Sequence, residues 1–139
     1  MLEWKASFEV GHPVIDKDHR ELVNILNLVM GDMNRDQTGA TLTLAFSRLV
    51  SYTKKHFATE ERLMAQHAYP GAAAHSAQHA ELIRSVEASE ADLRAGKPMV
   101  ASKATLFLQS WLLEHIMRTD KKLAEFLLSK SAAAGRSAA

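Results

Sequence analysis

The sequence predicts an all-α protein that folds as an up-down-up-down antiparallel four-helix bundle. Apolar residues recur at intervals of three or four along four long stretches, and no stretch alternates apolar and polar residues as a strand does. Short breaks with Gly, Asn or Pro separate the stretches at residues 31–39, 68–71 and 95–98. Helices joined by such short connections pack as antiparallel neighbours.

Length and composition indicate one domain. The chain has 139 residues, 47% of them hydrophobic and 24% charged, so it can bury one core and is too apolar to be disordered. The absence of cysteine excludes disulfides, thiolate metal sites and thiol nucleophiles. We expect one folded domain over residues 1–128 and a flexible tail over residues 129–139, where small and polar residues provide no apolar anchor.

The charge pattern limits the location and the partners of the protein. Glu3, Lys5 and Glu9 interrupt the apolar residues near the start, unlike a secretion signal. Charges also interrupt every apolar stretch before the roughly 20 residues that a membrane span needs. A net charge of +1 gives no broad field for nucleic acid or an anionic membrane. We expect a cytoplasmic protein without membrane or nucleic-acid partners, and we expect a monomer.

The first two predicted helices carry polar residues within their apolar stripes. The first helix is expected from about residue 16 or 18 to residue 33, with His19 at the start of the stripe. The second is expected over about residues 41–66, with His56 and Glu60 four residues apart on the inward face.

The last two predicted helices show the same feature. The third, over about residues 73–94, aligns His75 and His79 with its apolar residues. The fourth, over about residues 100–128, aligns His115 with its leucines.

The fourth helix contains a break in register. The stripe that includes His115 and the one that begins at Asp120 are out of step by one residue. Positions five apart differ by roughly 140° on an ideal α-helix, so both side chains cannot face inward without a local adjustment. We predict either a single π-type turn between them or a strong sideways lean of one of the two side chains.

Seven residues with metal-ligand side chains therefore lie where apolar residues are expected: His19, His56, Glu60, His75, His79, His115 and Asp120. A single pair at helical spacing is common on solvated faces and proves little. All four helices contribute here, however, and each unpaired buried polar group costs roughly 1 to 3 kcal/mol. Seven such groups would remove most of a typical stability of about 5 to 15 kcal/mol, whereas bound metal ions would satisfy them.

The chemistry of these side chains favours two metal ions. Imidazole and carboxylate suit iron, zinc, copper, nickel or manganese. Seven ligands exceed the four of a tetrahedral zinc site. They fit two ions that share two carboxylates, with five imidazoles split three and two. Glu60 and Asp120 would each span the pair, and one ion would keep an open position for a small ligand.

On these residues the chain resembles the hemerythrin-like proteins, in particular the bacterial single-domain hemerythrins. The resemblance covers roughly residues 1–128. It rests on Trp4, on the Tyr69-Pro70 turn and on four segments that hold the seven residues in order: IDKDHRELV, HFATEERLM, HSAQH and WLLEHIMRTD.

The resemblance implies a hemerythrin domain that binds O2 reversibly at two non-haem iron ions, bridged by an oxo or hydroxo group, for oxygen storage, delivery or scavenging. An oxygen-consuming enzyme is the partner expected for delivery. The implied ligands are His75, His79 and His115 on one iron, His19 and His56 on the iron with the open position, and Glu60 and Asp120 as bridges.

Phe57, Trp111 and Leu112 are the residues expected to line the O2-binding pocket, although plain core packing explains their positions equally well. An apolar lining provides no general acid, which favours reversible binding over catalytic turnover. We therefore do not expect an enzyme.

Three other functions remain open. The main alternative is an O2 or redox sensor that acts through a separate partner chain. Oxidase, peroxidase or nitric oxide chemistry is less favoured, because the ligand set is poor in carboxylate compared with oxygen-activating bundle enzymes. A purely structural metal site is the third.

Four other polar residues are set aside. His12 is interpreted as a turn residue and His67 as a helix C-terminal residue favoured by the helix dipole. Asp16 and Asp18 are expected to cap the first helix and to do no more.

Overall fold

The structure is a computed structural model that describes residues 2–34, 39–97 and 100–138, with the backbone alone at residues 32–34, 39–41, 100–102 and 131–138. All regular elements within these ranges are helical, as predicted. The break predicted over residues 31–39 is described only in part, and Pro98 of the last break lies outside the described residues.

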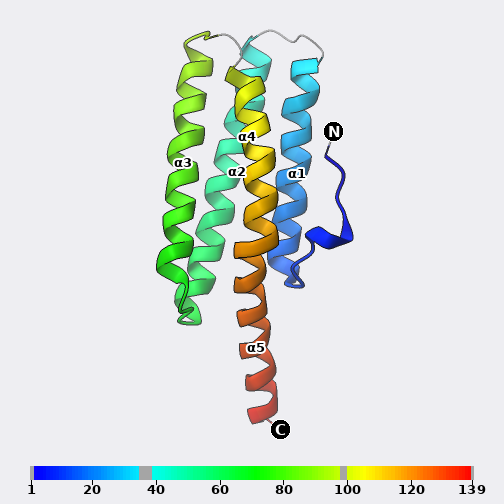
Figure 1. Cartoon of the computed structure of the whole chain (residues 1–139), viewed down its shortest axis with the longest axis vertical. Helices are drawn as coiled ribbons and strands as arrows, with labels where there is room; N and C mark the ends of the chain where they lie inside the picture. The colour runs from blue at the N-terminus through cyan, green and yellow to red at the C-terminus, as the bar shows by residue number, and fades with distance from the viewer. Residues whose placement is uncertain (1, 35–38, 98–99, 139) are drawn as a thin grey trace.

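Four helical rods form the bundle, running alternately up and down (Figure 1). They are α1 (Pro13–Asn34), α2 (Gly39–Gln66), α3 (Ala72–Arg94) and a fourth rod made of α4 (Val100–Glu114), the π-helix η2 (His115–Asp120) and α5 (Lys121–Ala138). The pairs in contact are α1 with α2, α2 with α3, α3 with α4, and α1 with α4, so the rods enclose one core. The predicted up-down-up-down bundle is confirmed.

Helix α1 begins at Pro13, before the predicted start at residue 16. Proline suits this position because its fixed φ is helical and its missing N–H has no partner in the first turn. Asp16 accepts hydrogen bonds from the backbone N–H groups of Val10, at 2.8 Å, and Gly11, at 3.1 Å. This side chain therefore fixes the chain that enters the helix.

The π-helix η2 lies where the break in register predicted it, and that prediction is confirmed. His115 and Asp120 are 3% and 1% exposed, so both face the interior. The extra residue in this turn brings the second half of the rod back into phase, because Leu123 and Leu127 are also buried.

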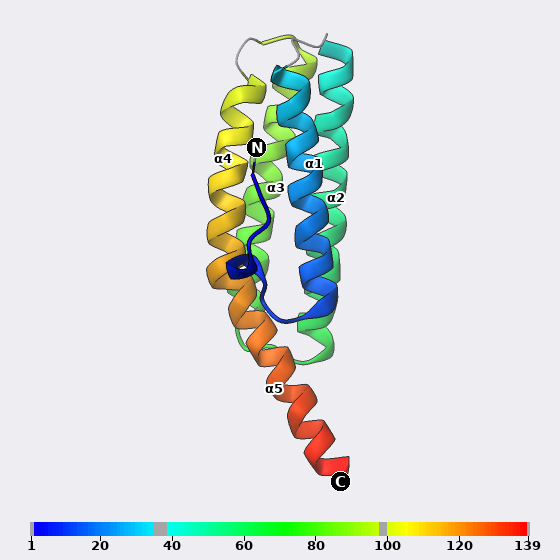
Figure 2. The ribbon, with the colours of Figure 1, turned by 90° about the vertical axis from the view of Figure 1, so that its right-hand side faces the viewer.

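A short N-terminal arm, which the sequence pattern did not predict, packs against the fourth rod. It contains the 3₁₀-helix η1 (Ala6–Phe8), whose Phe8 is buried, and η1 contacts η2. Figure 2 shows the arm running along the bundle in front of α1 and α4. The backbone N–H of Leu2 donates to Asn27 Oδ1 at 3.0 Å, which fixes the arm to α1.

Helix α5 continues to Ala138 and projects beyond the other helices (Figures 1 and 2). The sequence predicted that the helix ends near residue 128, so helical backbone extends further than expected. The flexibility of residues 129–139 stays a prediction.

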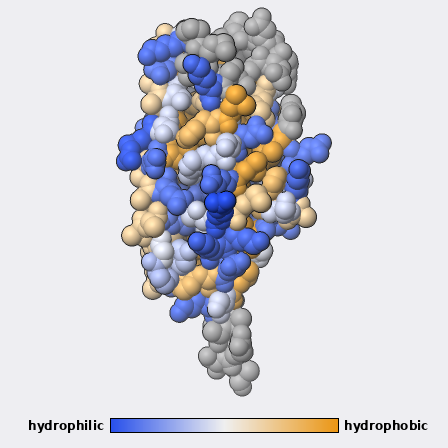
Figure 3. All heavy atoms as spheres, viewed as in Figure 1, coloured by the Kyte–Doolittle hydropathy of each residue, from blue (hydrophilic) through white to orange (hydrophobic). Residues whose placement is uncertain are grey.

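None of the helices in the described part of the chain is long and apolar enough to span a bilayer. Figure 3 shows hydrophilic and hydrophobic side chains interspersed on the α4 face.

Candidate metal centre

Seven buried side chains from all four rods meet in the core, and each is at most 3% exposed. They are His19, His56, Glu60, His75, His79, His115 and Asp120, which we call the seven-residue cluster. Their side-chain nitrogen and oxygen atoms form two overlapping groups within which all atoms lie inside 4.8 Å of one another. The structure thus brings together every residue that the sequence proposed as a metal ligand.

Glu60 belongs to both groups of atoms. Its Oε1 lies 2.8 Å from His56 Nε2, and its Oε2 lies 3.0 Å from His75 Nε2. The same Oε2 lies 3.2 Å from His79 Nε2. The two oxygens therefore face different histidines, as a carboxylate that joins two sites must do.

Asp120 completes the arrangement from the opposite rod. Its Oδ2 lies 2.7 Å from His19 Nε2, and its Oδ1 lies 2.9 Å from both His75 Nε2 and His115 Nε2. Asp120 reaches this position because the π-helix turns it inward together with His115. The two carboxylates thus span the space between the histidines of α1 and α2 and those of α3 and η2.

Several of these atoms are close but not hydrogen-bonded. His56 Nε2, Glu60 Oε1 and Asp120 Oδ1 are buried and have no hydrogen-bond partner among the described residues, although facing atoms lie 2.8 to 2.9 Å away. Buried polar atoms are nearly always satisfied in native proteins. Lone pairs that converge on a common space without hydrogen bonds are the arrangement that bound cations require, so these residues fit metal ions.

Two histidines of the cluster are held from outside by hydrogen bonds. His56 Nδ1 donates to Asp18 Oδ2 at 3.0 Å, and His115 Nδ1 donates to Gln78 Oε1 at 3.0 Å. A ring that donates from Nδ1 keeps the Nε2 lone pair for the interior. The expectation that Asp18 only caps α1 is wrong: the helix begins at Pro13, so Asp18 lies beyond the first turn and contacts His56.

Sequence reasoning missed both outer partners. Asp18 and Gln78 each precede a cluster histidine by one residue, which places them about 100° away around the helix. No spacing rule shows that such a neighbour reaches a histidine of another helix. Gln78 also accepts a hydrogen bond from Thr119 at 3.1 Å, which ties α3 to the π-helix.

Aromatic rings cover one side of the cluster. Phe57 stacks on His79 with ring centroids 3.7 Å apart, and Trp111 stacks on His115 with centroids 4.4 Å apart. The rings of Phe57 and Trp111 lie 5.9 Å apart. Leu112 is buried within the apolar core. Of the three residues predicted to line a pocket, Phe57 and Leu112 are thus buried, and Trp111 is half-buried at the edge of the core.

Carboxyl groups and imidazoles of the cluster shift one another's pKa values. Burial alone would raise the pKa of Glu60, but contacts with four histidines lower it well below its ordinary value. The pKa of Asp120 is likewise lowered by its histidine neighbours against the effect of burial. Burial lowers the pKa of His56, yet the contacts with Asp18 and Glu60 outweigh it and raise the pKa to about 10.

The remaining histidines of the cluster differ in their surroundings. Burial lowers the pKa of His75, but Asp120 and Glu60 raise it to about 9. For His79 burial dominates, and its pKa is lowered. His67 is exposed and His12 is half-buried before α1, and neither belongs to the two groups of atoms.

Comparisons with known proteins agree with this geometry. Residues 10–127 match the family described as Hemerythrin HHE cation binding domain. The chain is 31% identical over 128 residues to Bacteriohemerythrin of Stenotrophomonas maltophilia, covering 90% of this chain and 80% of that protein. It is 33% identical over 119 residues to Bacteriohemerythrin of Pseudomonas paraeruginosa, covering 86% and 76%. The crystal structure of wild-type hemerythrin aligns with a TM-score of 0.84 and 26% identity, covering 91% of this chain and 98% of that one.

Proposed function

This chain belongs to the hemerythrin family, and from this premise we propose that it binds O2 reversibly at two non-haem iron ions for oxygen storage, delivery or scavenging. The observation that supports the proposal most directly is the pair of overlapping atom groups that share Glu60 and Asp120. One metal ion could not use both groups, whereas two ions bridged by these carboxylates could.

The ligand assignment that we propose follows the two groups. His75, His79 and His115 would hold one iron, and His19 and His56 would hold the other, which leaves the second iron with one imidazole fewer. Glu60 and Asp120 belong to both groups, so these two carboxylates would be shared between the ions.

When bound, the iron pair supplies electrons and an open coordination position, which together allow O2 to bind and leave. The protein orients the imidazoles by the outer contacts of His56 and His115. Phe57, Trp111 and Leu112 would line the O2 pocket, and the burial of Phe57 and Leu112 would help to exclude water from it. These three side chains offer no general acid, so they favour release of O2 over its reduction in a catalytic cycle.

The test combines metal content with reversible oxygenation. Protein from iron-replete cells should contain two iron ions per chain, and the reduced protein should gain visible absorption in air and lose it under vacuum. The variant His75→Ala should lose both properties. His67→Ala, which changes an exposed histidine, should keep them. Irreversible oxidation of the wild type without an oxygenated form would contradict the proposal.

A further inference from the structure

A hydrogen-bonded chain leads from the surface to the seven-residue cluster between α1 and α2. The Tyr52 hydroxyl donates to Asp18 Oδ1 at 3.1 Å, and the other oxygen of the same carboxylate accepts from His56 Nδ1 at 3.0 Å. Tyr52 and His56 lie on α2, one turn apart, whereas Asp18 lies on α1. These two hydrogen bonds therefore join α1 to α2 beside the cluster.

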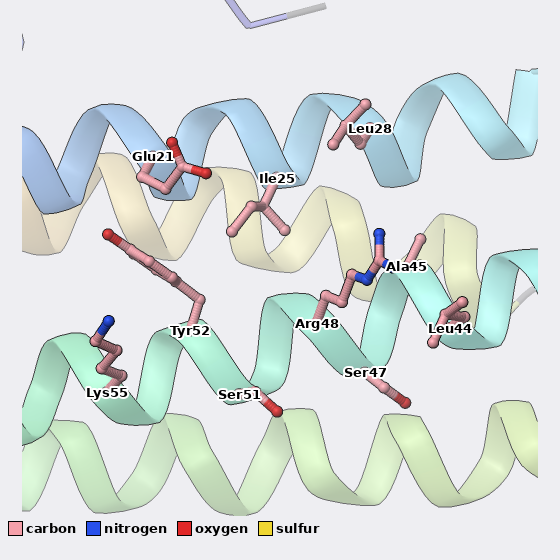
Figure 4. A pocket seen from close by; sticks show the side chains of 10 residues that line it. All are labelled: Glu21, Ile25, Leu28, Leu44, Ala45, Ser47, Arg48, Ser51, Tyr52 and Lys55. Atoms are coloured by element: carbon pink, nitrogen blue, oxygen red, sulfur yellow. The ribbon is translucent and has the colours of Figure 1, made fainter.

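Tyr52 is placed for this contact by its surroundings. It lies in a groove between α1 and α2 with Ile25 and Leu28 among the lining residues. Figure 4 shows its ring extending from α2 towards α1. The hydroxyl carries its own proton at neutral pH, since burial and the Asp18 carboxylate raise the pKa of Tyr52 to about 12.

The other histidines of the cluster have no comparable anionic partner. His115 donates to the neutral amide of Gln78. The Nδ1 atoms of His19, His75 and His79 are buried without a hydrogen-bond partner among the described residues. Among the described residues, Asp18 is thus the only carboxylate that accepts a hydrogen bond from the Nδ1 of a cluster histidine. The same carboxylate accepts the hydrogen bond from Tyr52.

We propose that Tyr52 is a positioning residue, which holds the Asp18 carboxylate against His56 and so fixes this ring for the iron with the open position. The inference rests on the proposed di-iron function and extends it to a residue outside the cluster. The side chain of Asp18 is 20% exposed, so without the Tyr52 hydroxyl it is free to turn towards water. Outer partners of this kind orient metal-bound histidines and strengthen their binding.

Tyr52→Phe removes the hydroxyl and keeps the ring, and Ser51→Ala is the matched control. Ser51, the exposed neighbour of Tyr52 in the same groove, carries a hydroxyl that is not part of the hydrogen-bonded chain to His56. We measure the rate at which each iron is released to a chelator, together with the absorption bands of the azide-bound ferric protein. These bands report the geometry of the open iron, which a purely structural role of Tyr52 would not change.

In the Tyr52→Phe protein, one of the two irons should leave about threefold to tenfold faster, as expected for the loss of one hydrogen bond. Asp18→Asn should increase the rate about tenfold to a hundredfold. The double variant should match Asp18→Asn within about twofold, because Tyr52 acts through Asp18. Ser51→Ala should match the wild type.

Unchanged release and unchanged azide bands in Tyr52→Phe would overturn the inference, as would additive effects in the double variant. If the wild type holds two irons but the variants give either of these results, the inference about Tyr52 fails and the proposed function still stands. If the wild type takes up no iron, the proposed function fails instead. The release comparison with zinc-loaded protein then tests the role of Tyr52 without iron or O2.

Discussion

Glu60 and Glu61 are adjacent carboxylates with opposite surroundings. Glu60 is fully buried among histidines, whereas Glu61 is half-buried and lies about 100° around the helix. A neutral amide at position 60 cannot bridge two cations, and it leaves the facing imidazoles without a negative charge. We predict that Glu60→Gln reduces the iron content from two per chain to one or none.

The matched control for this prediction is Glu61→Gln, which should keep two iron ions. Iron per chain, measured on folded protein whose helicity is checked by circular dichroism, distinguishes the two variants. Full iron content in Glu60→Gln would show that this carboxylate does not bridge.

Titration of the cluster should make the stability of the metal-free protein depend on pH. The pKa values of His56 and His75 are raised from the ordinary 6.5 to about 10 and about 9, so their contribution is complete below pH 6.5 and is lost as the pH rises through 9 to 10. The pKa of Glu60 is lowered from 4.5, so its contribution is complete above pH 4.5 and is lost as the pH falls through its folded-state pKa.

We therefore predict that the unfolding temperature of chelator-treated protein is highest between about pH 4.5 and 6.5 and decreases on both sides. Thermal unfolding followed by circular dichroism between pH 3 and 10 checks this. A constant unfolding temperature from pH 6 to 10 would contradict the proposed pairing of these histidines with carboxylates.

At the residue scale, the sequence predicted which side chains meet but not which ones support them. His19 and Asp120 were predictable because each interrupts an apolar stripe. Asp18, Tyr52 and Gln78 were not, because their contacts run to a different helix and depend on how the helices are rotated about their axes. Periodicity reports the face of one helix and carries no information about its neighbour's rotation.

At the scale of elements, the π-helix allows the residues before it and the residues after it in the fourth rod to face the same core. Met117 is 47% exposed within it, and its deletion should convert the turn into regular α-helix that keeps Leu123 and Leu127 inward. Deletion of the exposed Ser110, in the regular part of α4, instead acts on the residues between the deletion and the extra residue. The buried side chains of Leu112 and Ile116 would then turn about 100° out of the core.

We predict that the Ser110 deletion lowers the free energy of unfolding by roughly 3 to 6 kcal/mol, the cost of exposing two large aliphatic side chains. The Met117 deletion should cost clearly less. Urea unfolding of the two metal-free variants measures the difference. Equal losses would show that the π-helix does not serve to restore register.

On the scale of the whole molecule, metal binding should stabilise the bundle. Six of the seven buried residues of the cluster have a side-chain nitrogen or oxygen without a hydrogen-bond partner among the described residues. A ligand that binds only the folded chain stabilises it by about 4 kcal/mol at a thousandfold excess over its Kd. We predict a clear decrease in unfolding temperature after iron removal and recovery after reloading, both measured by calorimetry. Equal unfolding temperatures would show that metal binding and folding are not coupled.

The projecting end of α5 should contribute little to the bundle. It extends beyond the other helices, and Leu127 is the last buried apolar residue among those of this rod whose side chains the structure describes (Figures 1 and 2). We propose that residues 129–139 form a flexible tail outside the domain, and we predict that truncation after Lys130 leaves iron content and unfolding temperature unchanged. A large decrease in either, measured beside the full chain, would assign the tail a structural role.

The sequence by itself determined the four-helix architecture, the π-turn and the seven residues of the cluster. Each can be inferred from a single stretch of sequence, because helical periodicity determines which side chains share a face. A polar residue on an apolar face indicates that a partner is needed in the core.

Only the tertiary structure decided how these residues meet. The assignment of individual carboxylate oxygens to histidines, the chain from Tyr52 through Asp18 to His56, and the packing of the N-terminal arm on η2 all depend on the rotation and height of one helix relative to another. Those two quantities are set by packing of the complete core, which no single stretch of sequence contains.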